Sequence, residues 1–267
     1  MESVGVDSAD ESGSSSQNGV GRRGLLFSGA RVVAAAGLLG VAGSGVAPVA
    51  TAAQPVRYPT TGLRIPDTEL ARQAMEFVRE VSTPTLFGHV MRSYQFGVLM
   101  LERTGQRYDR ELLFVGAALH DLGLVERFVS TAERFELDGA DVARRFLRER
   151  GMSTARAEVV WDAIALHTNF TIAARKRPEI AAVAAGAGVD VSGQGLDQLD
   201  RDDVAEVLET YPRLGFKREA VANIIDQCRR KPMAYLLHPF AEVGRKYIPG
   251  FPVPTIEQAV LAAPFPE

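Results

Sequence analysis

The 267-residue sequence contains a single cysteine, Cys228, and only four histidines. One cysteine excludes an internal disulfide framework. Because Cys228 falls in an expected helix, we interpret it as a small buried hydrophobe rather than a nucleophile. An excess of charge of one sign is also missing, since the formal net charge is −3 and no basic stripe is interleaved with aromatic residues. These absences argue against a disulfide-rich scaffold and against a nucleic-acid polymer as partner.

Strand-like alternation with hairpin turns does not occur in the sequence, and no repeat of fixed period is present. The composition, 46% hydrophobic and 24% charged, is ordinary for a globular protein with one good-sized core. Apolar residues recur instead at the spacing of amphipathic helices. The sequence therefore predicts an all-α, single-domain helical bundle.

Residues 1–53 are expected to lie outside this fold. Residues 1–19, rich in Ser, Gly, Asp and Glu, should be disordered. Arg22-Arg23 then precedes a mildly apolar run, and Ala50-Thr51-Ala52 follows as a cleavage site, which together are typical of a twin-arginine signal peptide. The run is only weakly hydrophobic for a membrane span of about 20 residues. We therefore expect an exported protein, periplasmic or secreted, with no stable membrane anchor after cleavage and a catalytic domain over residues 54–267.

Helix boundaries in this domain are expected at capping residues, prolines and glycines. The predicted helices cover residues 67–81, 84–104, 110–120, 138–150 (starting at Asp138 or Gly139), 154–166, 178–186, 200–211, 216–230, 233–246 and 255–262. Residues 188–193, in which Asp190 lies among valines and glycines, are expected to form a loop.

His120 and Asp121 stand side by side at the end of an apolar helical run. A neutral imidazole and a carboxylate are good ligands for a divalent first-row cation. Adjacent residues on a straight helix point about 100° apart, so the two can share one metal only where the helix ends or bends, and Gly123 is placed to allow this. His89 and His167 fall in helical segments on either side. Helix-bundle interiors are suitable places for such a site.

The order His89, then His120-Asp121, then Asp190 resembles the signature of the HD superfamily of metal-dependent hydrolases. The likeness covers roughly residues 84–193 and implies an HD-type bundle with a metal site in its centre. We therefore expect His89, His120, Asp121 and Asp190 to bind the metal, together with His167, which is either a ligand or an acid–base group beside it.

Further stretches are similar to the cyanamide hydratase branch of that superfamily, namely residues 89–94, 134–140, 167–168 and 174–179. This likeness implies a mononuclear site, with Zn²⁺ or Fe²⁺ as the expected cation and Mn²⁺ as an alternative. It also implies addition of water to a small nitrile-like substrate, as in the conversion of cyanamide to urea. A single metal agrees with the lack of any histidine between His167 and Asp190, where the di-metal phosphodiesterases of the superfamily carry extra ones. The remaining histidine, His238, is expected to be structural.

The expected chemistry is attack by metal-activated water on a small substrate. Asp121 and His167 are the candidates for moving protons. Thr168, Asn169 or Arg92 could stabilise charge that develops on a substrate nitrogen.

Two other functions stay open at this point. One is a mononuclear phosphohydrolase acting on a nucleotide or other phosphomonoester, for which Arg92, Arg175 and Lys176 could contact the oxygens. Arg175 and Lys176 are explained more simply as part of an exposed basic patch. The other is a non-catalytic metal-binding protein, which is the less favoured reading. The expected partner is a small-molecule substrate, and the oligomeric state is left open between monomer and homo-oligomer.

Overall fold

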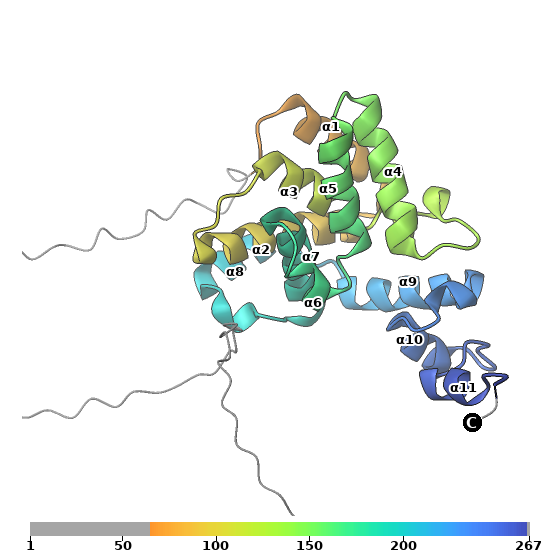
Figure 1. Cartoon of the computed structure of the whole chain (residues 1–267). Coiled ribbons are helices and arrows are strands. Elements are labelled where there is room, and N and C mark those ends of the chain that lie inside the picture. The colour runs from red at the N-terminus through yellow and green to blue at the C-terminus, as the bar shows by residue number, and fades with distance from the viewer. Residues whose placement is uncertain (1–64, 266–267) are drawn as a thin grey trace, which may run out of the picture. The chain divides into compact units, whose positions relative to one another are not determined.

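The computed structural model describes residues 65–265, and the predicted signal segment and domain boundary lie outside these residues (Figure 1). All regular elements in the described part are helical, which confirms the all-α prediction. None of its helices is long and apolar enough to cross a bilayer. The α-helices are α1 (Glu69–Val81), α2 (Pro84–Thr104), α3 (Arg110–Leu119), α4 (Phe135–Glu149), α5 (Thr154–Ala165), α6 (Phe170–Ala173), α7 (Pro178–Ser192), α8 (Arg201–Thr210), α9 (Phe216–Arg230), α10 (Phe240–Tyr247) and α11 (Ile256–Leu261). Short 3₁₀ turns are η1 (Leu122–Leu124), η2 (Glu126–Phe128), η3 (Leu196–Gln198) and η4 (Pro232–Tyr235).

The helices that carry the site start where the sequence indicates. Thr83 caps α2 by accepting a hydrogen bond from the Leu86 amide at 3.1 Å, and Pro84 occupies the first turn. The Asp109 carboxylate caps α3 in the same way. Gly105 ends α2 in the left-handed conformation with φ of 65°, which glycine adopts at low cost.

Helices α2 and α7 pack against each other through glycine. A Cβ atom at Gly186 would lie 1.9 Å from the carbonyl oxygen of Ser93, so only glycine permits this backbone contact. The prediction that the helix ends at Gly186 and that residues 188–193 form a loop was wrong, because Gly186 and Gly188 serve close packing and only Gly193 ends the helix. Helix α7 continues to Ser192, and Asp190 lies in its last turn.

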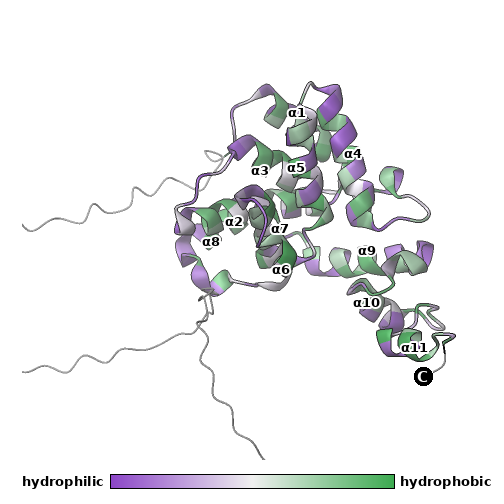
Figure 2. Cartoon of the chain, viewed as in Figure 1, coloured by the Kyte–Doolittle hydropathy of each residue, from purple (hydrophilic) through white to green (hydrophobic). Residues whose placement is uncertain are grey.

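The core is formed mainly by α2, α3, α5 and α7, with α1 and α4 packed around them. Figure 2 shows mixed purple and green along α4, whose apolar side faces this core. Helix α4 begins at Phe135 rather than at Asp138 or Gly139, because the Asp138 carboxylate is not a cap. It accepts a hydrogen bond from the Ser130 amide at 3.0 Å and pairs with Lys231.

The single helix predicted over residues 233–246 is divided into η4 and α10. Pro239 disfavours helical backbone at the preceding residue, and Leu237 has a φ of 61°. The chain therefore turns at residues 236–239 before α10 begins.

The C-terminal segment packs onto the bundle through α9, which also contacts α10 and η4 (Figure 1). After α9, Lys231 forms an ion pair with Asp138 of α4, and the two side chains are only 1% and 5% exposed. Nearby, the Gln227 amide donates to the Gly123 carbonyl at 3.4 Å. Arg230 pairs with Glu126 at 2.7 Å, but these side chains are 40% and 75% exposed.

We expect Lys231→Ala to lower the free energy of unfolding by about 3–5 kcal/mol, because it leaves the Asp138 charge buried and unpaired. The neighbouring Arg230→Ala is the matched control and should cost no more than about 1 kcal/mol, since solvent screens its ion pair. Urea unfolding followed by circular dichroism measures both. Equal losses in the two variants would contradict this account of how α9 is attached.

Candidate metal centre

The end of α3 brings His120 and Asp121 to one point. His120 keeps helical backbone (φ −64°, ψ −28°), whereas Asp121 leaves it (φ −104°, ψ 15°), and Asp121 Oδ2 lies 3.4 Å from His120 Nε2. Adjacent residues therefore converge because the helix ends between them, as the sequence predicts. Gly123 contributes differently from expected: its φ is not in the left-handed region, and a Cβ atom there would lie 1.9 Å from the Phe135 carbonyl oxygen. Glycine is needed because the start of α4 approaches this closely.

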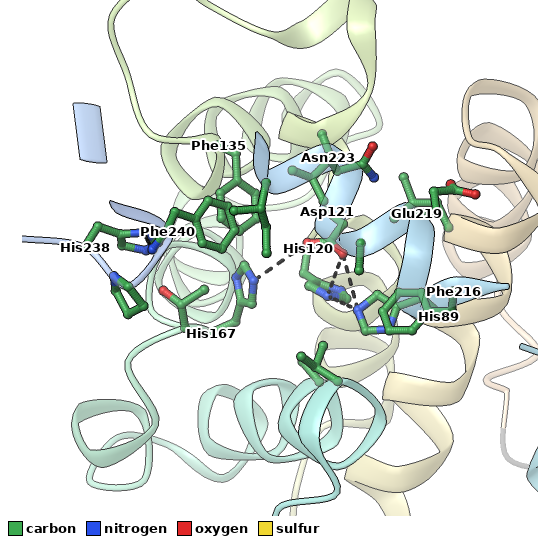
Figure 3. A pocket seen from close by; sticks show the side chains of 18 of the residues that line it. His89, His120, Asp121, Phe135, His167, Phe216, Glu219, Asn223, His238 and Phe240 are labelled. Atoms are coloured by element: carbon green, nitrogen blue, oxygen red, sulfur yellow. Dashed lines mark hydrogen bonds and ion pairs between the residues drawn. The ribbon is translucent and has the colours of Figure 1, made fainter. Parts of the chain in front are cut away.

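Helix α2 supplies the third member of the group, His89. Its Nε2 lies 3.3 Å from His120 Nε2 and 3.3 Å from Asp121 Oδ2, and all three residues are buried (Figure 3). Among the described residues, these three are the histidine and acidic side chains whose ligand atoms meet closely enough to hold a metal. Tetrahedral ligands at roughly 2.1 Å from a cation are about 3.4 Å apart. The observed separations therefore fit three ligands of one small divalent cation.

Hydrogen bonds on the outer side of the histidine rings fix which nitrogen faces the centre. His120 Nδ1 donates to the Ala117 carbonyl at 2.8 Å, and His167 Nδ1 donates to the Ile164 carbonyl at 2.7 Å. His89 Nδ1 donates to Asp190 Oδ2 at 2.7 Å. In each neutral ring the proton on Nδ1 leaves the lone pair on Nε2. Such outer partners are typical of metal-binding histidines, because they orient the ring and set its tautomer.

Burial and mutual charge set the proton affinities of the group. Burial lowers the pKa of His120 to about 3, so this ring stays neutral. Burial alone would raise the pKa of the Asp121 carboxyl, but the neighbouring histidines outweigh this effect and hold the pKa below its usual range. Burial would likewise lower the pKa of His89, yet its bonds to Asp121 and Asp190 raise it. Two imidazole nitrogens and a carboxylate at these distances form a donor set that fits a metal ion.

His167 lies beside this group rather than within it. Its Nε2 is 3.7 Å from Asp121 Oδ1, the carboxylate oxygen that faces away from His89, and its ring packs edge-on against His120 with centroids 4.8 Å apart (Figure 3). This placement is compatible with both roles considered for it, a further ligand or an acid–base group. The Asp121 carboxylate thus links the three-membered group to His167.

Asp190, expected to be a ligand, is not brought into the group. Besides its bond to His89 Nδ1, its carboxylate accepts from Arg92 Nε and Nη2 at 2.8 Å each and from Arg213 Nη1 at 2.6 Å. Burial would raise the Asp190 pKa, but these donors lower it to about 2. The carboxylate therefore stays ionised and holds the outer side of His89.

The three residues expected to contact substrate differ in position. Thr168 lines the cavity in front of the metal group, whereas Arg92 and Asn169 are not among its lining residues. Arg92 is completely buried behind Asp190, and its Nη1 also donates to the Tyr211 and Pro212 carbonyls. Arg92 therefore orients Asp190 and does not face a substrate.

The metal group opens into a cavity of about 240 Å³ (Figure 3). Its lining is mostly apolar and contains neither lysine nor arginine among the described residues. Apart from the histidines, Asp121 and Thr168, the lining residues are Leu86, Leu124, Phe135, Phe170, Ala187, Val191, Phe216, Glu219, Ala220, Asn223, Ile224, Pro239 and Phe240. The residues from α9 were not foreseen, because alanine, valine and isoleucine occur around most of that helix and its periodicity does not show which side faces inward.

His238 is buried and hydrogen-bonded, and it also lines this cavity. Its Nε2 donates to Glu136 Oε1 at 2.9 Å, while its Nδ1 accepts from the Phe240 amide at 3.2 Å. Glu136 Oε1 further accepts from Thr168 Oγ1 at 2.7 Å and from Arg134. Burial would raise the pKa of Glu136, but these donors hold it below its usual range, so the carboxyl is ionised. Glu136 was not foreseen as part of the site, because a glutamate near a helix start is usually exposed.

Residues 86–205 match the family model of the HD domain. This part of the chain, somewhat less than half of it, is similar to the HD domain. HD domains are generally metal-dependent hydrolases, which agrees with the buried histidine–aspartate group. The predicted metal-binding residues all lie within the matched segment, whereas α9 and His238 lie beyond it. A search of curated proteins found no match.

We expect His120→Ala to lose the bound divalent metal, because it removes a central ligand of the HD site. His238→Ala is the matched control, since His238 lines the same cavity but bonds Glu136 instead of facing the metal group. Elemental analysis of the purified variants, with circular dichroism to verify folding, measures the difference. Equal metal content in the two variants would contradict the assignment.

Asp190→Asn separates two roles for that residue. If Asp190 orients His89 from outside, the variant should still bind metal, with an affinity reduced about 10- to 100-fold. Competition with a chelator of known affinity gives the ratio, and His120→Ala supplies the reference for a lost ligand. A loss as complete as that of His120→Ala would show that Asp190 itself binds the metal.

Proposed function

We propose that the protein is a metal-dependent hydratase or hydrolase that adds water to a small neutral substrate, in the manner of the cyanamide hydratase branch. The observation that carries the proposal is the buried imidazole–carboxylate group at the end of a mainly apolar cavity with no lysine or arginine in its described lining. A site of this kind disfavours a negatively charged substrate, because an anion would lose its hydration without finding a cationic side chain in the described lining.

His89, His120 and Asp121 would hold the metal, which we propose to be Zn²⁺ or Fe²⁺. A divalent cation supplies Lewis acidity, which makes water nucleophilic near neutral pH and polarises the substrate. His167 Nε2 is the group that would take up a proton from the attacking water and return it to the substrate nitrogen, because its Nδ1 is committed to the Ile164 carbonyl. Asp121 Oδ1, 3.7 Å away, would stabilise the resulting positive charge.

Thr168 is the candidate for orienting the substrate. Its hydroxyl proton is committed to the ionised Glu136 carboxylate, and its oxygen accepts from Asn169 Nδ2 at 3.5 Å, which leaves one lone pair of that oxygen for a substrate donor. A substrate with an N–H group, such as cyanamide or an amide, matches this acceptor. Thr168 would therefore accept a hydrogen bond from the substrate instead of donating a proton to a substrate nitrogen.

Phosphomonoester hydrolysis is less well supported, since phosphate oxygens require cationic partners. Arg92 and Arg213, which lie near the metal group, are both bonded to Asp190. Lys176 lies on the surface and pairs with Asp162 at 3.4 Å. No arginine or lysine is thus left to meet a phosphate in the described part of the cavity.

Export through the twin-arginine route, with a small molecule rather than a nucleic acid as partner, is part of the same proposal. A twin-arginine signal carries folded proteins, which suits an enzyme that receives its metal before export. Fractionation of cells that express the full chain tests this part separately from activity.

The activity is tested by incubating purified, metal-loaded protein with cyanamide, small nitriles, small amides and a panel of nucleotides and other phosphomonoesters. We expect the wild type to add water to, or hydrolyse, the neutral compounds. The rate should fall at least about 100-fold in Asp121→Asn, because that variant weakens both the metal group and the support of His167. Ala222→Leu, on the exposed side of α9, serves as the control for general effects of substitution on the fold. Phosphate release from the phosphomonoesters, with no turnover of neutral compounds, would overturn the proposal.

A further inference from the structure

One wall of the cavity is a single face of α9. The residues of α9 that line it are Phe216, Glu219, Ala220, Asn223 and Ile224. Their spacing of three and four residues places them along one side of a helix. The wall lies beyond the matched HD segment, so the metal group and this wall come from different parts of the chain (Figure 3).

The α9 face is held against the HD domain near both ends. At the N-terminal end, Thr83 donates a hydrogen bond to Glu219, and Phe216 stacks on the His89 ring with centroids 4.5 Å apart. At the C-terminal end, Gln227 bonds the Gly123 carbonyl and Lys231 forms its buried ion pair. Contacts at both ends make the wall a fixed surface beside the metal group.

The size and lining of the cavity do not correspond to cyanamide alone. A cavity of about 150 Å³ with an apolar lining is large enough for benzene, and this one has about 240 Å³. Cyanamide has three non-hydrogen atoms and would leave most of this apolar space unfilled. The surplus lies among aromatic and aliphatic side chains, including Phe135, Phe240 and Ile224.

The polar groups on α9 add a preference about charge. The Glu219 carboxylate is half-buried at the cavity and would disfavour an anionic substrate. The Asn223 side chain, one turn further on, can both donate to and accept from a neutral polar group. Neither supplies the positive charge that a carboxylate or phosphate would need.

We infer that the α9 face is the specificity wall of the enzyme, and that it selects substrates without negative charge that carry an apolar body larger than benzene beside the reacting group. This inference rests on the proposed function for the identity of the reacting group. The specificity wall itself is tested by substrate binding alone. Ala220 and Ile224 set the depth of the apolar space, and Asn223 meets a polar atom of the substrate.

The probes are straight-chain primary amides from acetamide to octanamide, whose binding to the metal-loaded protein is measured by ligand-detected NMR and calorimetry. Each buried methylene contributes about 0.8 kcal/mol, so affinity should rise about fourfold per methylene until the cavity is filled and then level off. In Ala220→Leu the rise should stop at a shorter chain, and in Ile224→Ala at a longer one.

Ala222→Leu is the matched control, because Ala222 lies on the exposed side of the same helix and gains the same side chain. It should bind the amide series as the wild type does. If Ala220→Leu does not fold, Ile224→Ala decides the question alone. An affinity independent of chain length, or identical profiles in Ala222→Leu and the folded wall variants, would overturn the inference.

Binding and turnover distinguish the two proposals. Hydration of cyanamide without any gain in affinity along the amide series would support the proposed function and reject the specificity wall. A chain-length profile that shifts as expected in the wall variants, without turnover of any neutral compound, would support the wall and reject the proposed function.

Discussion

The structure depends on a buried point where the ligand atoms of His89, His120 and Asp121 meet. His89 and His120 each use Nδ1 to bond a neighbouring oxygen, so each directs an Nε2 lone pair toward the other and toward the Asp121 carboxylate. Two imidazole nitrogens and a carboxylate oxygen about 3.3 Å apart in a medium of low dielectric constant favour a cation among them. The bundle maintains this arrangement because α3 ends at that point and α2 passes beside it.

Asp190 connects this point to the surrounding structure. It bonds the outer nitrogen of His89 while accepting from Arg92 and Arg213, and Arg92 also bonds two carbonyl groups after α8. Two guanidinium groups thus compensate a carboxylate that would otherwise be buried without a partner. The same bonds engage both arginines, and the described cavity lining contains no arginine or lysine. One cluster of charges therefore both orients a metal-binding ring and shapes selectivity.

Much of the HD site could be predicted from the sequence, because local rules act on it. The pair His120-Asp121 after an apolar helical run indicated a convergence at a helix end, and the capping residues placed α2 and α3 correctly. The role of Asp190 could not be predicted in this way. Its position depends on α7 continuing through Gly186, where glycine serves contact with α2 rather than a turn, and a single sequence does not distinguish these two uses of glycine.

The residues that line the cavity from α9 could not be predicted from the sequence for a related reason. Helix α9 carries apolar residues on several sides, so its inward face is defined only by tertiary contacts such as the buried pair of Lys231 and Asp138. These contacts join the C-terminal segment to the HD domain without involving His120 or Asp121. Substitutions at Ala220 or Ile224 can therefore change the space available to a substrate while the metal-binding atoms stay in place. On the proposed function, the HD domain supplies the chemistry and the added helix determines which neutral molecule reaches it.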